Sequence, residues 1–104
     1  MVLNLSYIDS IAGDNLEVKN KLLKILYQEL NDNLIDFNKN LEVSNFDEIA
    51  KILHKTKHKI KMLDLIDFFN FTQELEKKCS GNDLNKKEVE YFQLTLKSLI
   101  NKLQ

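Results

Sequence analysis

The two histidines of this chain, His54 and His58, lie four residues apart in a segment rich in lysine. Residues 51–61 contain five lysines and no acidic residue, although the whole 104-residue chain has a net charge of −1. Residues four apart on a helix share one face, so both imidazoles are expected to stand among ammonium groups. Three kinds of chemistry could use this pattern: a metal site, a phosphate-binding face for nucleic acid, or a histidine that accepts a phosphoryl group.

A metal site has the least support of the three. Histidines four apart on a helix can share one zinc ion, but two ligands do not complete a site. No Asp, Glu or Cys lies in the same stretch, and the lysines repel a cation. We therefore expect no metal ligand and no resident cofactor.

A nucleic-acid-binding face is the second candidate, because lysines along one helix can follow phosphates in weak, salt-sensitive binding. Three features count against it: the near-neutral total charge, the absence of arginine, and the lack of interleaved aromatic residues that could stack on bases. We expect no nucleic-acid partner. A lysine-rich nucleic-acid-binding bundle and a merely solvated lysine face are kept as alternatives.

Phosphoryl transfer to a histidine uses every part of the pattern. A neutral imidazole is a good nucleophile towards an activated phosphoryl group. Nearby lysines disfavour the imidazolium before transfer, and the same ammonium groups stabilise the added negative charge afterwards. The chain has no glycine-rich nucleotide loop and no acidic cluster for magnesium beside His54, so a partner must supply the phosphoryl group and the metal.

The rest of the chain predicts long helices, because proline is absent and glycine occurs only twice. Apolar residues recur at alternating spacings of three and four, which marks one buried face on each helix. Short connections make sequential helices antiparallel. We predict an all-α fold, an antiparallel up-down four-helix bundle with a short N-terminal helix, in one domain of residues 1–104. On the helix that carries the histidines, the expected buried residues are Phe46, Ile49, Leu53, Thr56, Ile60 and Leu63.

Helix starts are marked by residues whose side chains can accept a hydrogen bond from the first turn. Gly13 and the segment Ser80-Gly81-Asn82-Asp83 are the expected stops. The expected caps, in chain order, are Ser6, the segment Asp14-Asn15-Leu16-Glu17, Ser44 or Asn45, and Asn85.

The position of His54 follows from its neighbour Leu53, which belongs to the predicted buried face. One residue further along a helix turns the side chain by about 100°. His54 is therefore expected at the solvent edge of the bundle. Ala50, one turn earlier, is small and leaves the imidazole open on that side.

The segment His54-Lys55-Thr56-Lys57-His58, with Leu75-Glu76 on the following helix, resembles the signature of the histidine-containing phosphotransfer (HPt) domains of bacterial two-component phosphorelays. That signature is a histidine, any residue, usually leucine, lysine, usually glycine, and a second glycine further on. His58-Lys59-Ile60-Lys61 also fits the local pattern, but placing the motif there puts Leu75-Glu76 four residues too early. We therefore assign the motif histidine to His54. The chain departs from the family pattern at Thr56, His58 and Asp64.

The resemblance implies a phosphoryl carrier without catalytic turnover of its own. It also implies a role for each motif residue. His54 would accept a phosphoryl group from an aspartyl phosphate on a receiver domain and pass it to another receiver. Lys57 would neutralise that group, Lys61 would act at longer range, and His58 would crowd the phosphate or add a hydrogen bond. Gln73 on the neighbouring helix is a candidate contact of the imidazole. The apolar docking patch beside His54 is expected to include Ile8, Ile11 and Ala50.

The implied partners are response-regulator receiver domains, hybrid histidine kinases or both, with magnesium supplied by the receiver. The single cysteine, Cys79, fits a reducing compartment and is expected to be buried. No apolar run approaches membrane-spanning length, so we expect a cytoplasmic protein without membrane contact. The resemblance implies a bacterial origin and a monomeric state. An initiating Met1 followed directly by domain sequence favours a freestanding protein over a fragment of a hybrid kinase. The main alternative is a bundle that docks on a kinase or receiver and inhibits it without transfer.

Overall fold

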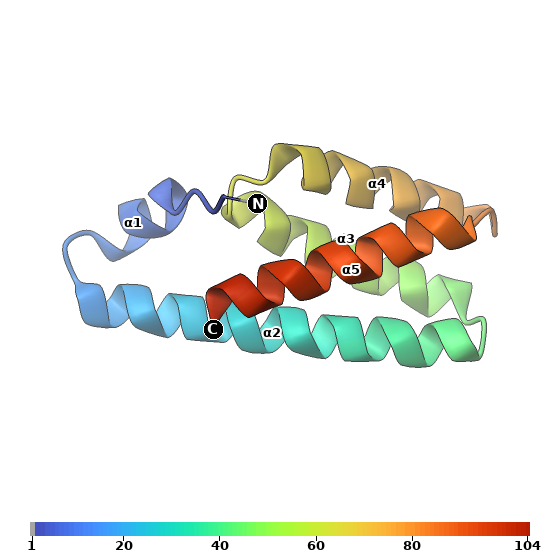
Figure 1. Cartoon of the computed structure of the whole chain (residues 1–104), viewed down its shortest axis with the longest axis horizontal. Coiled ribbons are helices and arrows are strands. Elements are labelled where there is room, and N and C mark those ends of the chain that lie inside the picture. The colour runs from blue at the N-terminus through green and yellow to red at the C-terminus, as the bar shows by residue number, and fades with distance from the viewer. Residues whose placement is uncertain (1) are drawn as a thin grey trace.

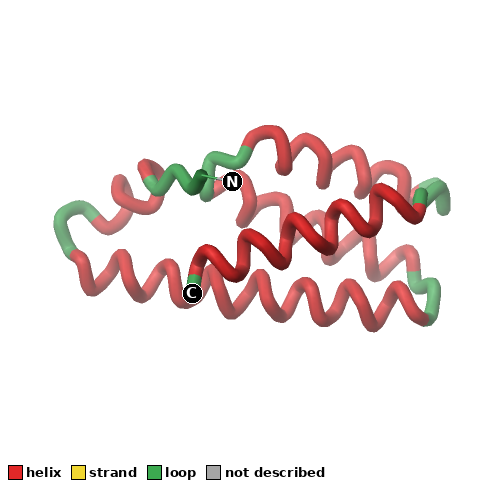
Figure 2. Tube along the Cα trace, in the orientation of Figure 1, coloured by secondary structure: helices red, strands yellow, loops and turns green. Residues whose placement is uncertain are grey.

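The computed structural model describes residues 2–104, and these form five helices and no strand. In chain order the helices are α1 (Ser6–Ala12), α2 (Leu16–Glu42), α3 (Phe46–Met62), α4 (Ile66–Ser80) and α5 (Lys86–Leu103). Figure 1 shows α2 to α5 side by side, each antiparallel to the one before it, with α1 at one end. The connections between them are short (Figure 2). The predicted all-α fold is confirmed. Within residues 2–104, no helix combines the length and the apolar content that crossing a membrane requires.

The four long helices close a ring, because α2 packs on α3, α3 on α4, α4 on α5, and α5 back on α2. The short helix α1 packs on α2. The segment before α1 reaches the turn between α3 and α4, where Asn4 Nδ2 donates a 2.9 Å hydrogen bond to Asp64 Oδ2. The bundle is elongated, at 45 × 23 × 19 Å. Its ring order makes α3 and α4 direct neighbours along most of their length.

Asparagine side chains begin three of the long helices. Asn15, Asn45 and Asn85 each accept a hydrogen bond from a backbone N–H group in the first turn. Such caps satisfy donors that the helix leaves unpaired, and each typically stabilises by about 1 kcal/mol. The prediction that Ser6 caps α1 is wrong. That helix begins at Ser6 itself, whose N–H group donates to Asn4 Oδ1 at 2.9 Å.

The predicted buried face of α3 is confirmed, with one exception. Five of the six expected residues are buried, and Phe46 at the start of the helix is only partly buried. The core contains an aromatic cluster, in which the rings of Phe37 and Phe92 have centroids 4.9 Å apart and that of Phe68 lies 5.9 Å from Phe92. Burying each such side chain contributes about 1.5–3 kcal/mol, so this core holds the helices in register.

Cys79 is buried, as predicted, with 1% of its surface exposed. Its thiol donates to the backbone oxygen of Phe46 at 3.1 Å. Burial raises the pKa of the Cys79 thiol, and the negative charge of Asp47 raises it further. A thiol kept protonated is a poor nucleophile and a poor metal ligand, so Cys79 serves the packing of α4 against α3.

Candidate functional site

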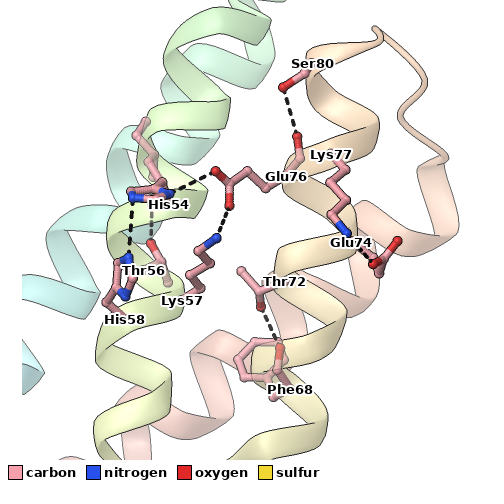
Figure 3. Close-up of polar contacts among 11 residues, drawn as sticks. His54, Thr56, Lys57, His58, Phe68, Thr72, Glu74, Glu76, Lys77 and Ser80 are labelled. Atoms are coloured by element: carbon pink, nitrogen blue, oxygen red, sulfur yellow. Dashed lines mark hydrogen bonds and ion pairs between the residues drawn. The ribbon is translucent and has the colours of Figure 1, made fainter.

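His54 stands at the solvent edge of α3, as its position next to Leu53 predicts. Leu53 is fully buried, whereas 56% of the His54 side chain is exposed. Figure 3 shows the imidazole at the boundary between α3 and α4, with polar side chains of both helices around it. The ring is therefore accessible to solvent and also within reach of a second helix.

A carboxylate from α4 contacts the imidazole. Glu76 Oε2 lies 3.0 Å from Nδ1 of His54, and Glu76 Oε1 lies 2.8 Å from Nζ of Lys57 (Figure 3). Only 12% of the Lys57 side chain and 21% of the Glu76 side chain are exposed, so salt and water screen this contact weakly. One carboxylate thus joins the histidine and the lysine across the boundary between α3 and α4.

Opposing effects set the charge of Glu76. Burial raises the pKa of its carboxyl group, but the nearby ammonium of Lys57 and the imidazole of His54 together outweigh burial and hold the pKa below its ordinary value. The carboxylate is therefore ionised at neutral pH and can only accept hydrogen bonds. Nδ1 of a neutral His54 must then carry the proton, which leaves the lone pair on Nε2.

The contact between Lys57 and Glu76 is close but poorly aligned. Although Nζ and Oε1 are 2.8 Å apart, the buried Oε1 accepts no hydrogen bond of regular geometry from residues 2–104. Coulomb attraction at this distance persists without alignment, so the contact is an ion pair. The ammonium of Lys57 carries three donors on a flexible stem, and one of them can turn towards a new acceptor.

His58 contacts the other ring nitrogen of His54. The two Nε2 atoms are 3.3 Å apart, and the rings meet edge to face with centroids 4.8 Å apart and planes at 81°. Figure 3 shows His54 between His58 and Glu76. Both ring nitrogens of His54 therefore have a side-chain partner.

The lysines of α3 are less free than their sequence suggests. Besides Lys57, Lys51 and Lys59 lie 3.9 and 3.7 Å from glutamate oxygens. Lys61 Nζ lies 5.5 Å from the centre of the Phe69 ring, which is a cation–π contact. These pairings leave less unpaired positive charge along α3, which weakens the nucleic-acid interpretation.

Two grooves flank the histidines. A groove of about 340 Å³ lies beside His54, with Ala50 and Glu76 in its lining. A second groove of about 440 Å³ lies beside His58, between α1 and the end of α3, with Tyr7 in its lining. The two imidazoles therefore open on different grooves.

The helices α2 to α5 also carry a family signature, since the family model of the Hpt domain matches residues 21–104. The chain belongs to the Hpt domain family. Histidine phosphotransfer in phosphorelays is the function of these domains, and receiver domains and kinases are their partners. No curated protein and no solved structure matches the chain.

In this Hpt domain, the predicted site residues do not all meet. His54 and Lys57 both contact Glu76, and His58 contacts His54. Lys61 lies one turn further along α3, over an aromatic ring. Gln73 makes no hydrogen bond with His54 among residues 2–104. The functional roles of these residues stay predictions.

The predicted docking residues differ in exposure. Ile8 is fully buried, so its inclusion in a docking surface is wrong, because its side chain anchors α1 in the core. Ile11 is half exposed, and Ala50 is partly buried beside the groove at His54. Ile11 and Ala50 stay predicted members of the surface.

Glu76 is the site residue that sequence analysis missed. Residues 51–61 contain no acid, so the sequence shows no carboxylate beside the histidines, and Leu75-Glu76 serves only to place the motif. The contact joins residues 22 positions apart and exists because α3 and α4 are antiparallel neighbours. A signal was present: Glu76 follows the buried Leu75 as His54 follows the buried Leu53, so each lies at the edge of its buried face.

Proposed function

We propose that His54 accepts a phosphoryl group from the aspartyl phosphate of one receiver domain and passes it to another. The hydrogen bond between Nδ1 of His54 and the ionised Glu76 is the observation that supports this most directly. It holds the neutral ring in the tautomer whose nucleophilic nitrogen is Nε2, on a side chain that is more than half exposed.

In the proposed transfer, the lone pair of Nε2 forms the bond to phosphorus. The bond from phosphorus to the aspartyl oxygen breaks, and its electron pair goes to the receiver carboxylate. The Nδ1 proton stays on the ring, where the negative charge of Glu76 stabilises the positive charge that the imidazole gains. Magnesium belongs to the receiver, and this chain acts as a carrier that contributes no metal site.

Three neighbours are proposed to stabilise the phosphoryl group on His54. Lys57 is the first of these, because its poorly aligned ammonium can turn from Glu76 towards a phosphoryl oxygen. His58 can donate a hydrogen bond from its ring. Lys61 adds positive charge from one turn further along the helix, at longer range.

The receiver is proposed to dock beside His54, on a surface that includes Ile11 and Ala50. The N-terminal segment would belong to the same domain of residues 1–104, because Ile8 is part of the core and Asn4 bonds to the turn after α3. A cytoplasmic location, a monomeric state and a bacterial origin also stay predictions.

The test uses a receiver domain phosphorylated with radioactive acetyl phosphate in the presence of magnesium. After mixing, we expect acid-labile, base-stable label on the wild-type protein and on Lys97→Gln, a control at an exposed position of α5. We expect no label on His54→Gln. Label that survives in His54→Gln would show that another residue is the acceptor.

A second candidate function is a bundle that binds a kinase or receiver without transfer. It is favoured by one observation: His58, where the family usually has glycine, contacts Nε2 of His54. This function predicts binding to a receiver that is the same for the wild type and His54→Ala, together with no label on either protein.

A further inference from the structure

The imidazole of His58 contacts Nε2 of His54, the nitrogen that the proposed transfer needs. The two Nε2 atoms are 3.3 Å apart, on residues one turn apart along α3. Glu76 contacts the opposite nitrogen, Nδ1, at 3.0 Å. The inference below rests on the proposed role of His54 and concerns how its nucleophilic nitrogen is held at rest.

The proton positions follow from the partners of His54. The carboxylate of Glu76 is an acceptor, so Nδ1 of a neutral His54 donates to it, and Nε2 is left as an acceptor. A hydrogen bond between the two Nε2 atoms then requires His58 to carry the proton on its own Nε2 and to donate it. His58 can do so both as this neutral tautomer and as the imidazolium.

We propose that His58 is a hydrogen-bond cap on the nucleophilic nitrogen of His54, which must be displaced before a phosphoryl group can bond there. In-line attack needs the Nε2 lone pair directed at phosphorus, and a lone pair that accepts a hydrogen bond from His58 is not free for that approach. The cap stabilises the resting site and lowers the rate at which His54 accepts phosphate.

The His58 side chain has room to leave this position. It is exposed, and it also lines the groove of about 440 Å³ that contains Tyr7 and Lys61. Rotation about its side-chain bonds moves the ring away from His54 without any change in the helix, and exposed side chains make such moves in picoseconds to nanoseconds. The cap is therefore reversible, and its N–H group can donate to a phosphoryl oxygen after transfer.

The experiment measures phosphorylation of His54 by phosphoramidate, a small donor that removes receiver docking from the rate. The lone pair of His54 forms the new bond to phosphorus. The phosphorus–nitrogen bond of the donor breaks, and ammonia leaves with the electron pair and takes up a proton from solvent. Rates are compared for the wild type, His58→Ala, His58→Gln and His58→Phe, with labelling in a His54→Gln background subtracted.

Removal of the cap is expected to raise the rate about two- to tenfold in His58→Ala, the range that one net hydrogen bond corresponds to. Alanine is the best helix former, so α3 is retained. His58→Phe, which keeps a ring without a donor, is expected to be faster than the wild type as well. His58→Gln, whose amide N–H reaches a similar position, restores a donor and is expected to be slower than His58→Ala.

If the wild type is labelled, a rate in His58→Ala equal to that of the wild type would overturn the cap. A rate in His58→Phe as slow as that of the wild type would also overturn it, because bulk alone would then be the obstacle.

The nitrogen chemical shifts of His54 give a second readout that does not depend on transfer. In His58→Ala, the Nε2 signal is expected to move towards that of a nitrogen without a hydrogen bond, while Nδ1, held by Glu76, stays in place. An Nε2 signal that does not move overturns the cap even if His54 is labelled normally. If no protein is labelled but the Nε2 signal moves as expected, the cap stands and the acceptor role of His54 fails.

Discussion

Two pairs of lysine and glutamate join neighbouring helices at the same closest distance, yet they have different surroundings. Between α4 and α5, the ammonium of Lys78 contacts both carboxylate oxygens of Glu88, at 2.9 and 2.8 Å. Between α3 and α4, Lys57 lies 2.8 Å from only one oxygen of Glu76, and the other oxygen contacts an imidazole. Both oxygens of the Glu88 carboxylate contact Lys78, whereas the two oxygens of Glu76 contact different side chains, Lys57 and His54.

The contact with His54 distinguishes the candidate site at Glu76 from the structural contact at Glu88. The pair of Lys78 and Glu88 is more exposed, at 40% and 28%, and exposed ion pairs contribute little to stability. Glu76 is less exposed, and its charge determines which nitrogen of His54 carries the proton. A lysine–glutamate pair therefore joins two helices between α4 and α5, and between α3 and α4 it also orients a histidine.

The largest expected contrast is in phosphoryl transfer. Glu76→Ala removes the acceptor that holds the Nδ1 proton. Loss of such an orienting partner costs about 10- to 100-fold at metal-binding histidines, and a loss of this order is expected here. Glu88→Ala breaks the other pair and is expected to leave the transfer rate unchanged. The measurement is the initial rate of label transfer from a phosphorylated receiver to each variant.

Glu76→Gln serves as the matched control in that experiment, because its amide oxygen can still accept from Nδ1. It is expected to retain more activity than Glu76→Ala. Equal losses in Glu76→Ala and Glu88→Ala would mean that both variants act through general destabilisation, and the contrast between the two boundaries would be lost.

The next contrast is in stability. Lys57→Met leaves a mostly buried carboxylate with one partner fewer, and such a group typically costs about 1–3 kcal/mol of folding free energy. Lys78→Met breaks an exposed pair and is expected to have a smaller effect. Urea unfolding followed by circular dichroism measures both. If Lys78→Met lowered the free energy of unfolding as much as Lys57→Met, the ranking of the two pairs by burial would be wrong.

The sequence was sufficient for the fold because its signals are local. Apolar spacing placed Leu53, Thr56 and Ile60 in the core, and asparagines marked three helix starts. The start of the N-terminal helix is not predicted correctly, because it depends on Asn4, whose side chain bonds both to the Ser6 amide and to a distant turn. The burial of Ile8 is not predicted for a similar reason, because a seven-residue helix has too few turns for spacing to define its buried face.

The sequence predicts those features of the candidate site that depend on spacing along one helix, but not those that depend on how two helices pack. The exposure of His54 follows from one step along a helix, which spacing determines. The contacts with Glu76 and between the two imidazoles depend on how α3 and α4 lie against each other and on side-chain rotation, which spacing does not determine. Asp64 shows the same limit. The sequence shows that Asp64 stands where the family usually has glycine. It does not show that Asp64 takes a left-handed conformation (φ 56°) or that its carboxylate accepts a hydrogen bond from Asn4.

The smallest expected contrast is in the dependence of stability on pH, where the two boundaries should respond at opposite ends of the scale. The pKa of Glu76 is lowered in the folded protein, so its contribution is present above the ordinary value of 4.5 and is lost as pH falls through the folded pKa. Hydrogen bonding to Glu88 raises the pKa of Lys78, so its contribution is present below 10.5 and is lost as pH rises through the folded pKa.

Urea unfolding midpoints across the pH range test this contrast, with each variant read as its difference from the wild type so that the other acids cancel. Glu76→Gln is expected to flatten only the acid limb of the curve, because an amide has no proton to gain there. Lys78→Gln is expected to flatten only the alkaline limb, and by little, because water screens an exposed pair. If Glu76→Gln left the acid limb unchanged, the folded pKa of Glu76 would equal its unfolded value. The carboxylate would then draw no net stabilisation from Lys57 and His54, and the distinction between the two pairs would reduce to exposure alone.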